Sequence, residues 1–217
     1  DWQNRTQRFF KEKIKLYGLK SSEVSKISRK YFNEIETLPK KEIFDMCEEL
    51  FKSDVQEEAM VAADWSYRLR FKYELKDIYI FEKWIEKYIN NWAKCDIFCN
   101  HSVGSLIEKY PQLVKNLKTW AKSKNLWVRR ASAVSLIAPA RKGLFLKDIF
   151  EICDLLLVDK EDMVQKGYGW LLKVSSEKHQ KEVFDYVLSN KDKMPRTSLR
   201  YAIEKMSQKM KSQAMKS

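Results

Sequence analysis

Hydrophobic residues recur with the period of an α-helix along most of this 217-residue chain, with polar residues between them. Apolar side chains recur three and four positions apart, which places them on one face of a helix. The chain has only 5 Gly and 4 Pro, a composition that suits helices joined by short connections. The pattern predicts helices over residues 1–17, 23–33, 40–51, 55–71, 74–88, 91–108, 111–123, 126–138, 146–157, 162–174, 178–189 and 195–206.

The segment 77–81 favours a β-strand by composition, but it lies inside a helical pattern and is assigned to a helix. The predicted fold class is therefore all-α. No connection is rich in Gly, Ser or Pro, so residues 1–207 are expected to form a single domain. The polar, basic tail 208–217 is expected to be frayed or disordered.

Four of the helical segments repeat. Their starting positions lie 35, 36 and 34 residues apart, at Trp92, Trp127, Met163 and Thr197. Three positions further on, the same register is mostly basic: Cys95, Arg130, Lys166 and Arg200. A helical pattern with this period predicts a HEAT-like solenoid of stacked helix pairs. Because a solenoid presents equivalent positions on one concave face, we expect Arg130, Lys166 and Arg200 to form a basic face.

The charge of the chain favours a polyanionic partner. Lys and Arg number 42 against 30 Asp and Glu, which gives a net charge of +12. An excess of this size indicates nucleic acid or another acidic surface as partner. The alternative is a basic protein with no such partner.

The cysteines point to a cytoplasmic protein. The chain has 4 Cys without the spacing of a small disulfide-stabilised domain. Cys95, Cys99 and His101 suggest zinc, but no second Cys or His pair follows at a finger-like distance, so buried free thiols are favoured. No metal or cofactor is expected. No apolar run approaches the length of a membrane span and no signal peptide is visible, so no membrane partner is expected.

Three segments carry candidate chemistry. Trp92 and Asp96 are four residues apart and share one helix face, although a core tryptophan beside a solvated carboxylate would give the same spacing. Arg130, beside small Ala131, is expected either to pair with a carboxylate or to contact a phosphate.

The third segment has two glycines, Gly167 and Gly169, inside a helical pattern. Each costs about 1 kcal/mol relative to Ala. Their presence predicts the close approach of a backbone or a ligand. The neighbouring Trp170 is either a packing residue or one wall of a cleft.

Together these segments resemble the bacterial AlkD-type alkylpurine DNA glycosylases, which are built from HEAT-like repeats. The resemblance covers most of the chain and is most specific between Asn90 and Leu172. It rests on Trp92 with Asp96, on the segment 126–131, and on the segment 169–171. Two features depart from the family pattern: Gly18 to Ser22 lacks a proline near the N-terminus, and Ala93 replaces a second tryptophan.

The resemblance implies that Asp96 is the catalytic carboxylate, that Trp92 and Trp170 wall the lesion cleft, and that Arg130 contacts the DNA backbone. It also implies that the alkylated base is excised without being flipped into a pocket. These residue types suit that chemistry: a carboxylate stabilises an oxocarbenium-like sugar, and indole faces attract a cationic base.

Three functions stay open at this point. The first is a glycosylase that excises cationic N3- or N7-alkylated purines from double-stranded DNA, acting as a monomer. The second is a non-catalytic relative that recognises bent or branched DNA through its basic face. The third is a protein-binding scaffold, which the basic positions Arg130, Lys166 and Arg200 argue against.

Overall fold

The computed structural model describes residues 2–216, and helices joined by short connections make up most of this range. The α-helices are α1 (Trp2–Gln7), α2 (Ser21–Ile35), α3 (Lys40–Lys52), α4 (Gln56–Arg68), α5 (Asp77–Tyr88), α6 (Trp92–Phe98), α7 (Gly104–Lys109), α8 (Val114–Trp120), α9 (Leu126–Val134), α10 (Ile137–Arg141), α11 (Leu146–Leu156), α12 (Asp162–Ser175), α13 (Gln180–Asn190), α14 (Arg196–Ala202) and α15 (Gln208–Met215). Two 3₁₀ turns, η1 (Arg70–Lys72) and η3 (Pro111–Leu113), and one π-helical turn, η2 (Cys99–Val103), connect some of them. The described residues form no β-strand, so the predicted all-α class is confirmed.

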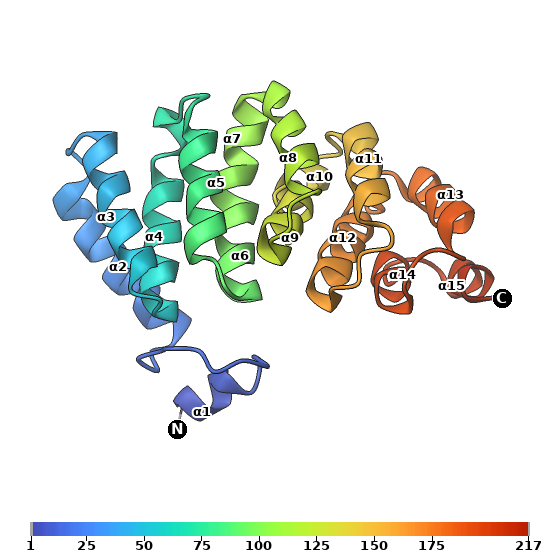
Figure 1. The fold of residues 1–217 in the computed structure, drawn as a ribbon, viewed down its shortest axis with the longest axis horizontal. Helices are drawn as coiled ribbons and strands as arrows, with labels where there is room; N and C mark the ends of the chain where they lie inside the picture. The colour runs from blue at the N-terminus through green and yellow to red at the C-terminus, as the bar shows by residue number, and fades with distance from the viewer. Residues whose placement is uncertain (1, 217) are drawn as a thin grey trace.

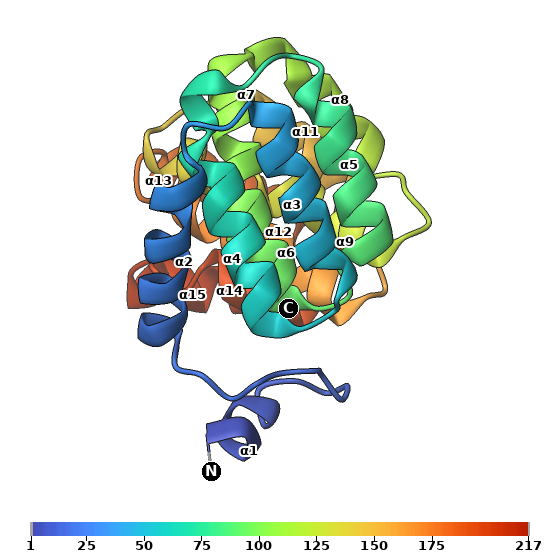
Figure 2. The ribbon, with the colours of Figure 1, turned by 90° about the vertical axis from the view of Figure 1, so that its left-hand side faces the viewer.

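The helices stand in two layers that form a helical-repeat solenoid. Figure 1 shows them side by side in a curved row, from α2 and α3 at one end to α14 and α15 at the other. In one layer α2, α4, α6, α9, α12 and α14 pack against one another in that order. Helices α3, α8 and α11 cover this layer, each packing on one or more of its members. The view turned by 90° in Figure 2 shows the N-terminal segment hanging beneath the helices.

Hydrogen bonds between residues one repeat apart hold successive copies in register. The hydroxyl groups of Ser66 and Ser102, 36 positions apart, are 2.7 Å from each other. The Tyr110 hydroxyl donates to the backbone carbonyl of Tyr73, 37 positions earlier, at 3.1 Å. The same spacing that the sequence shows as a repeat is thus the spacing at which side chains meet.

An aromatic cluster fixes α6 against its neighbours. Phe44 from α3, Phe81 and Trp84 from α5, and Phe98 from α6 are all buried. The rings of Phe81 and Phe98 are 5.2 Å apart and nearly perpendicular, an arrangement that aromatic pairs favour. Because Phe98 ends α6, this cluster sets the position of the helix that carries Trp92 and Asp96.

Most predicted helices are confirmed to within a few residues, but the predicted helix over residues 1–17 is wrong. Helix α1 ends at Gln7. The Gln7 side chain donates to the carbonyl of Glu12 and accepts from the amide of Ile14, and these two bonds stabilise the loop that follows the helix. Gly18 has a positive φ of 91°, a conformation that glycine adopts without strain. Residues 2–20 are called the N-terminal arm below.

The C-terminal segment is also more ordered than expected. Helix α15 is capped by Ser207, whose hydroxyl accepts from the amide of Met210 at 3.3 Å, and Ala214 is buried. The prediction of a frayed tail is therefore wrong for residues 208–215.

Two long predicted helices are also interrupted, at η2 within 91–108 and at Ser135 within 126–138.

The prediction of buried free thiols is confirmed, since all four cysteines are buried and form no disulfide. Among the described residues, no group of three or more His, Cys, Asp or Glu side chains could hold a metal ion. No helix in the described part of the chain is long and apolar enough to cross a membrane.

Candidate active site

A cleft of about 350 Å³ opens where α6, α9, α12 and α14 meet the N-terminal arm. Nine residues line it: Phe9, Trp92, Asp96, Arg130, Met163, Lys166, Trp170, Lys173 and Tyr201. Three aromatic residues of the solenoid, one carboxylate and three cationic side chains thus converge on one space.

Asp96 and Arg130 form a two-pronged ion pair in the cleft. Nε of Arg130 donates to Oδ1 of Asp96 at 2.9 Å, and Nη2 donates to Oδ2 at 2.7 Å. The third nitrogen, Nη1, donates to the backbone carbonyl of Met163. The Arg130 side chain is only 6% exposed and that of Asp96 17%, so one edge of the carboxylate faces the cleft. This fork geometry fixes the orientation of the carboxylate as well as its charge.

The electrostatics of the pair combine burial with attraction. Burial raises the pKa of Asp96 above its ordinary value, and the charge and hydrogen bonds of Arg130 oppose that rise. Burial also disfavours the charged form of Arg130, but Asp96 outweighs it and the pKa of the guanidinium is raised. With a permanently charged partner in bidentate contact, Asp96 is a carboxylate at neutral pH.

Local contacts explain why α6 presents Asp96 at this point. The side chain of Asn91 caps the helix by accepting from the amide of Lys94 at 2.9 Å. Lys94 is itself buried, and its ammonium donates to Oδ1 of Asp54 at 2.6 Å and to the Asp54 carbonyl at 3.1 Å. Trp92 therefore lies in the first turn of a helix whose start is fixed, and Asp96 follows one turn later on the same face.

One face of α12 supplies the opposite wall. Met163, Lys166, Trp170 and Lys173 are spaced three, four and three residues apart, which aligns them along a helix. Of the two glycines between them, Gly169 has the role expected from the sequence, whereas a Cβ at Gly167 would meet only side chains, the nearest at 3.4 Å. A Cβ at Gly169 would lie 2.9 Å from the Ser198 carbonyl, so α14 can approach only because that atom is absent.

The N-terminal arm closes the remaining side of the cleft. Phe10 stacks on Trp92 with ring centroids 5.3 Å apart, and Nε1 of Trp92 donates to the carbonyl of Phe9 at 3.3 Å. Phe10 lines the neighbouring hollow and not the cleft, so it supports Trp92 from outside. The ring of Phe9, which is largely exposed, lies at the cleft edge.

The structure brings together five of the six site residues expected from the sequence: Trp92, Asp96, Arg130, Lys166 and Trp170. Arg200 is exposed on α14 and does not line the cleft, although its neighbour Tyr201 does. Arg130 takes the first of the two interactions considered for it, the pairing with a carboxylate.

Sequence reasoning missed Phe9, Lys173 and Tyr201. Lys173 lies seven positions after Lys166, two helical turns along the same face, so the α12 pattern contained a signal for it. Its ammonium is 3.0 Å from Glu204 and lies over the Tyr201 ring. Nothing in the local sequence places Phe9 near Trp92, because that contact spans the whole of two repeats.

A family model described as DNA alkylation repair enzyme matches residues 2–206 of the chain. The chain belongs to the DNA alkylation repair enzyme family. Among curated proteins, none matches it with significant similarity.

Two solved structures share the fold of this family member. A protein from Enterococcus faecalis, described as a "predicted DNA alkylation repair enzyme", has a TM-score of 0.85 and 16% identity, with 95% of each chain covered. The protein smu.31 from Streptococcus mutans has a TM-score of 0.65 and 21% identity, with 95% of this chain and 100% of that one covered. At these identities the likeness establishes the fold alone.

Proposed function

We propose that this protein is a DNA glycosylase that excises cationic N3- or N7-alkylated purines from double-stranded DNA. The observation that carries the proposal is the oriented Asp96 carboxylate, held by Arg130 at the floor of a cleft between two tryptophans. The net charge of +12 supports DNA as the partner. Action as a monomer is part of the proposal.

Asp96 is the proposed catalytic carboxylate. Alkylation gives the purine a positive charge, so the glycosidic bond from C1′ to the base nitrogen breaks with both electrons moving to the base. The sugar left behind has oxocarbenium character, and a fixed negative charge nearby stabilises it. Water then adds to C1′ and loses its proton, for which Asp96 is a suitably placed acceptor. The products are the free alkylpurine and an abasic site.

The tryptophans account for selectivity in this proposal. Indole faces attract cations, by about 0.5–2 kcal/mol depending on exposure. Trp92 and Trp170 therefore favour an alkylated purine over its neutral parent. In this proposal the base is excised without being flipped into a pocket.

The cationic residues around the cleft are proposed to contact the DNA backbone. Lys166 pairs with Asp162 at 2.7 Å but keeps part of its side chain exposed, and Arg200 is exposed nearby. Arg130 is mainly committed to Asp96, yet only three of the five N–H groups of a guanidinium are used in the contacts described. The contact between Arg130 and the DNA backbone that the sequence suggested stays a prediction, and the two remaining N–H groups would make it.

The test is release of free base. Purified protein is incubated with methylated duplex DNA, and N7-methylguanine and N3-methyladenine are measured by chromatography while abasic sites are measured as alkali-labile breaks. We expect both bases to be released in step with the breaks. Tight duplex binding without any release would instead identify a non-catalytic DNA-binding protein, and absence of both would refute a role on DNA.

A further inference from the structure

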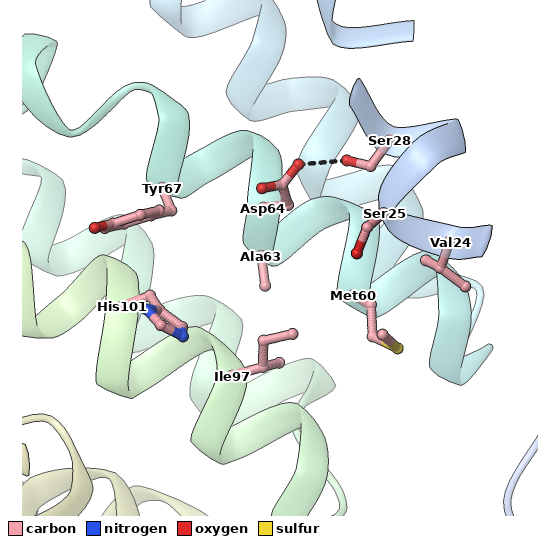
Figure 3. Close-up of a pocket in the computed structure, with 9 residues that line it drawn as sticks. All are labelled: Val24, Ser25, Ser28, Met60, Ala63, Asp64, Tyr67, Ile97 and His101. Atoms are coloured by element: carbon pink, nitrogen blue, oxygen red, sulfur yellow. Dashed lines mark hydrogen bonds between the residues drawn. The ribbon is translucent and has the colours of Figure 1, made fainter. Parts of the chain in front are cut away.

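A second pocket, of about 250 Å³, lies on the same layer of helices between α2, α4 and the π-helical turn η2. Figure 3 shows Tyr67 and His101 at one end, Val24 and Met60 at the other, and Asp64 above the space between them. None of the residues that line this pocket lines the Asp96 cleft. The proposed excision chemistry leaves it without a role.

The polar side chains at the α2 side of this pocket present acceptors. Oδ2 of Asp64 accepts from the Ser28 hydroxyl at 2.6 Å and from Nε of Arg68 at 2.7 Å. Among the described residues no group donates to Oδ1 of Asp64, and the side chain is 34% exposed. Ser25 uses its hydroxyl hydrogen on the Ser21 carbonyl at 2.9 Å, so its free lone pairs are acceptors too. A ligand group that lies against Asp64 and Ser25 must therefore bring a donor, such as an N–H.

The other end of the pocket is aromatic. The Tyr67 and His101 rings lie 5.3 Å apart. Burial lowers the pKa of His101 despite the charge of Asp64, so the imidazole is neutral at neutral pH and available for stacking. His101 belongs to η2, and π-helical turns are rare and frequent at functional sites. Flat rings at one end and the Asp64 carboxylate beside the middle of the space suit a nucleobase, and that carboxylate repels a phosphate.

Shared lining residues link this pocket to the candidate active site. Met60 and Ile97 line both the pocket and the hollow beside the N-terminal arm, and Phe9 and Trp92 line both that hollow and the cleft. Neighbouring helices lie 8–10 Å apart and rise about 1.5 Å per residue, which puts this pocket on the order of 10 Å from Asp96. The grooves of duplex DNA are roughly 6–12 Å wide, so a strand opposite the lesion strand comes within reach.

We propose that this pocket receives the base opposite the lesion, and that it holds cytosine, the partner of an alkylated guanine, more tightly than thymine, the partner of an alkylated adenine. This inference rests on the proposed function. The volume lies below the roughly 300–1,000 Å³ of sites for larger ligands, which suits a single base. Aspartate is a known type of acceptor for the cytosine amino group, whereas thymine has no such group to offer.

The test uses duplexes that cannot be excised. Each carries a tetrahydrofuran abasic analogue opposite either cytosine or thymine, and affinity is measured by fluorescence anisotropy at fixed salt. The wild-type protein is expected to bind the cytosine duplex about tenfold more tightly, the value of one hydrogen bond to a charged group. Asp64→Asn keeps an acceptor for Ser28 and Arg68 but turns an amide N–H toward the pocket, so the preference should vanish or reverse.

Two further variants make the result specific. Ser25→Leu fills the pocket from an exposed helix position without touching the contacts of Asp64, and should also abolish the preference. Asp45→Asn, at an exposed ion pair on α3, is the matched control and should keep it. Equal wild-type affinities, a preference that survives both pocket variants, or no duplex binding would each overturn the inference. Because the analogue has no base to release, an inactive glycosylase would leave this result unaffected.

Discussion

Glu57 is expected to anchor the N-terminal arm, and its replacement by glutamine should release it. The Glu57 carboxylate is buried and accepts three backbone hydrogen bonds: from Gly18 at 2.8 Å, Leu19 at 3.1 Å and Tyr17 at 3.1 Å. Gly18 and Leu19 share Oε1, while Tyr17 uses Oε2. This one side chain fixes three consecutive amides of the arm to α4, beside the hydrogen bonds from the Gln56 amide to the Lys15 carbonyl and from the Tyr17 hydroxyl to Glu58.

The size of the effect follows from these contacts. In Glu57→Gln one oxygen becomes an N–H₂ group that cannot accept from Tyr17, and the other loses its charge. Hydrogen bonds to charged groups contribute about 1.5–3 kcal/mol and neutral ones about 0.5–1.5 kcal/mol. The substitution removes one of the three hydrogen bonds and weakens the other two, but it also removes the cost of burying a charge. The net local destabilisation is about 2–4 kcal/mol. The core beneath the arm is untouched, so global stability should change less.

Hydrogen exchange measures this directly. Exchange at the amides of residues 17–19 should accelerate by roughly 30- to 700-fold, since 1.4 kcal/mol is a factor of ten. Glu58→Gln is the matched control, because Glu58 accepts only the exposed Tyr17 hydroxyl. If the amides exchange equally slowly in Glu57→Gln and the control, the three-bond anchor is not what holds the arm.

Three further predictions concern stability and DNA binding. Burial alone would raise the pKa of Glu48, but hydrogen bonds led by that from Lys83 outweigh it and lower it from 4.5 to about 2. The charged Glu48 therefore contributes about 2 kcal/mol to the free energy of unfolding above about pH 4.5, and this contribution is lost as the pH falls toward 2. In Glu48→Gln the denaturant midpoint should consequently depend less on pH across that range. Gly169→Ala should lower stability by about 1–3 kcal/mol in thermal melts, because the added Cβ meets the Ser198 carbonyl, whereas Gly167→Ala meets only a side chain at 3.4 Å and should cost less. Duplex affinity should fall with salt by a log–log slope of about −0.9 per phosphate contacted, and a flat dependence would contradict a DNA backbone interface.

The solenoid could be predicted because its signals are local. Helix α11, expected over 146–157, spans Leu146–Leu156, since its apolar face and its breaks lie within the segment itself. The repeat period also carried information about contacts. Asp96 and Arg130 are 34 positions apart, one repeat, and they meet. Which partner Arg130 would choose depended on the rotation of two helices, which the period does not fix.

The N-terminal arm could not be predicted, because the interactions that shape it are not local. Its sequence has an amphipathic pattern, but the amides of residues 17–19 bond to a carboxylate about 40 positions away. These bonds and the pairing of Lys15 with Val55 replace helical hydrogen bonds. Gly104, which follows the π-helical turn, also reflects a non-local contact, because a Cβ there would lie 2.9 Å from the Ser135 carbonyl.

Single-turnover excision of N7-methylguanine by Asp96→Asn tests the central claim most directly. The matched control is Asp159→Asn, which breaks another largely buried pair, with Arg129 at 2.6 Å, outside the cleft. Losing one positioned electrostatic group costs about 2.7–4 kcal/mol of barrier, so Asp96→Asn should be about 10²- to 10³-fold slower while its duplex affinity stays near that of the wild type. Asp159→Asn should excise at the wild-type rate once folded. An Asp96→Asn protein within about threefold of that rate would contradict the catalytic role of Asp96.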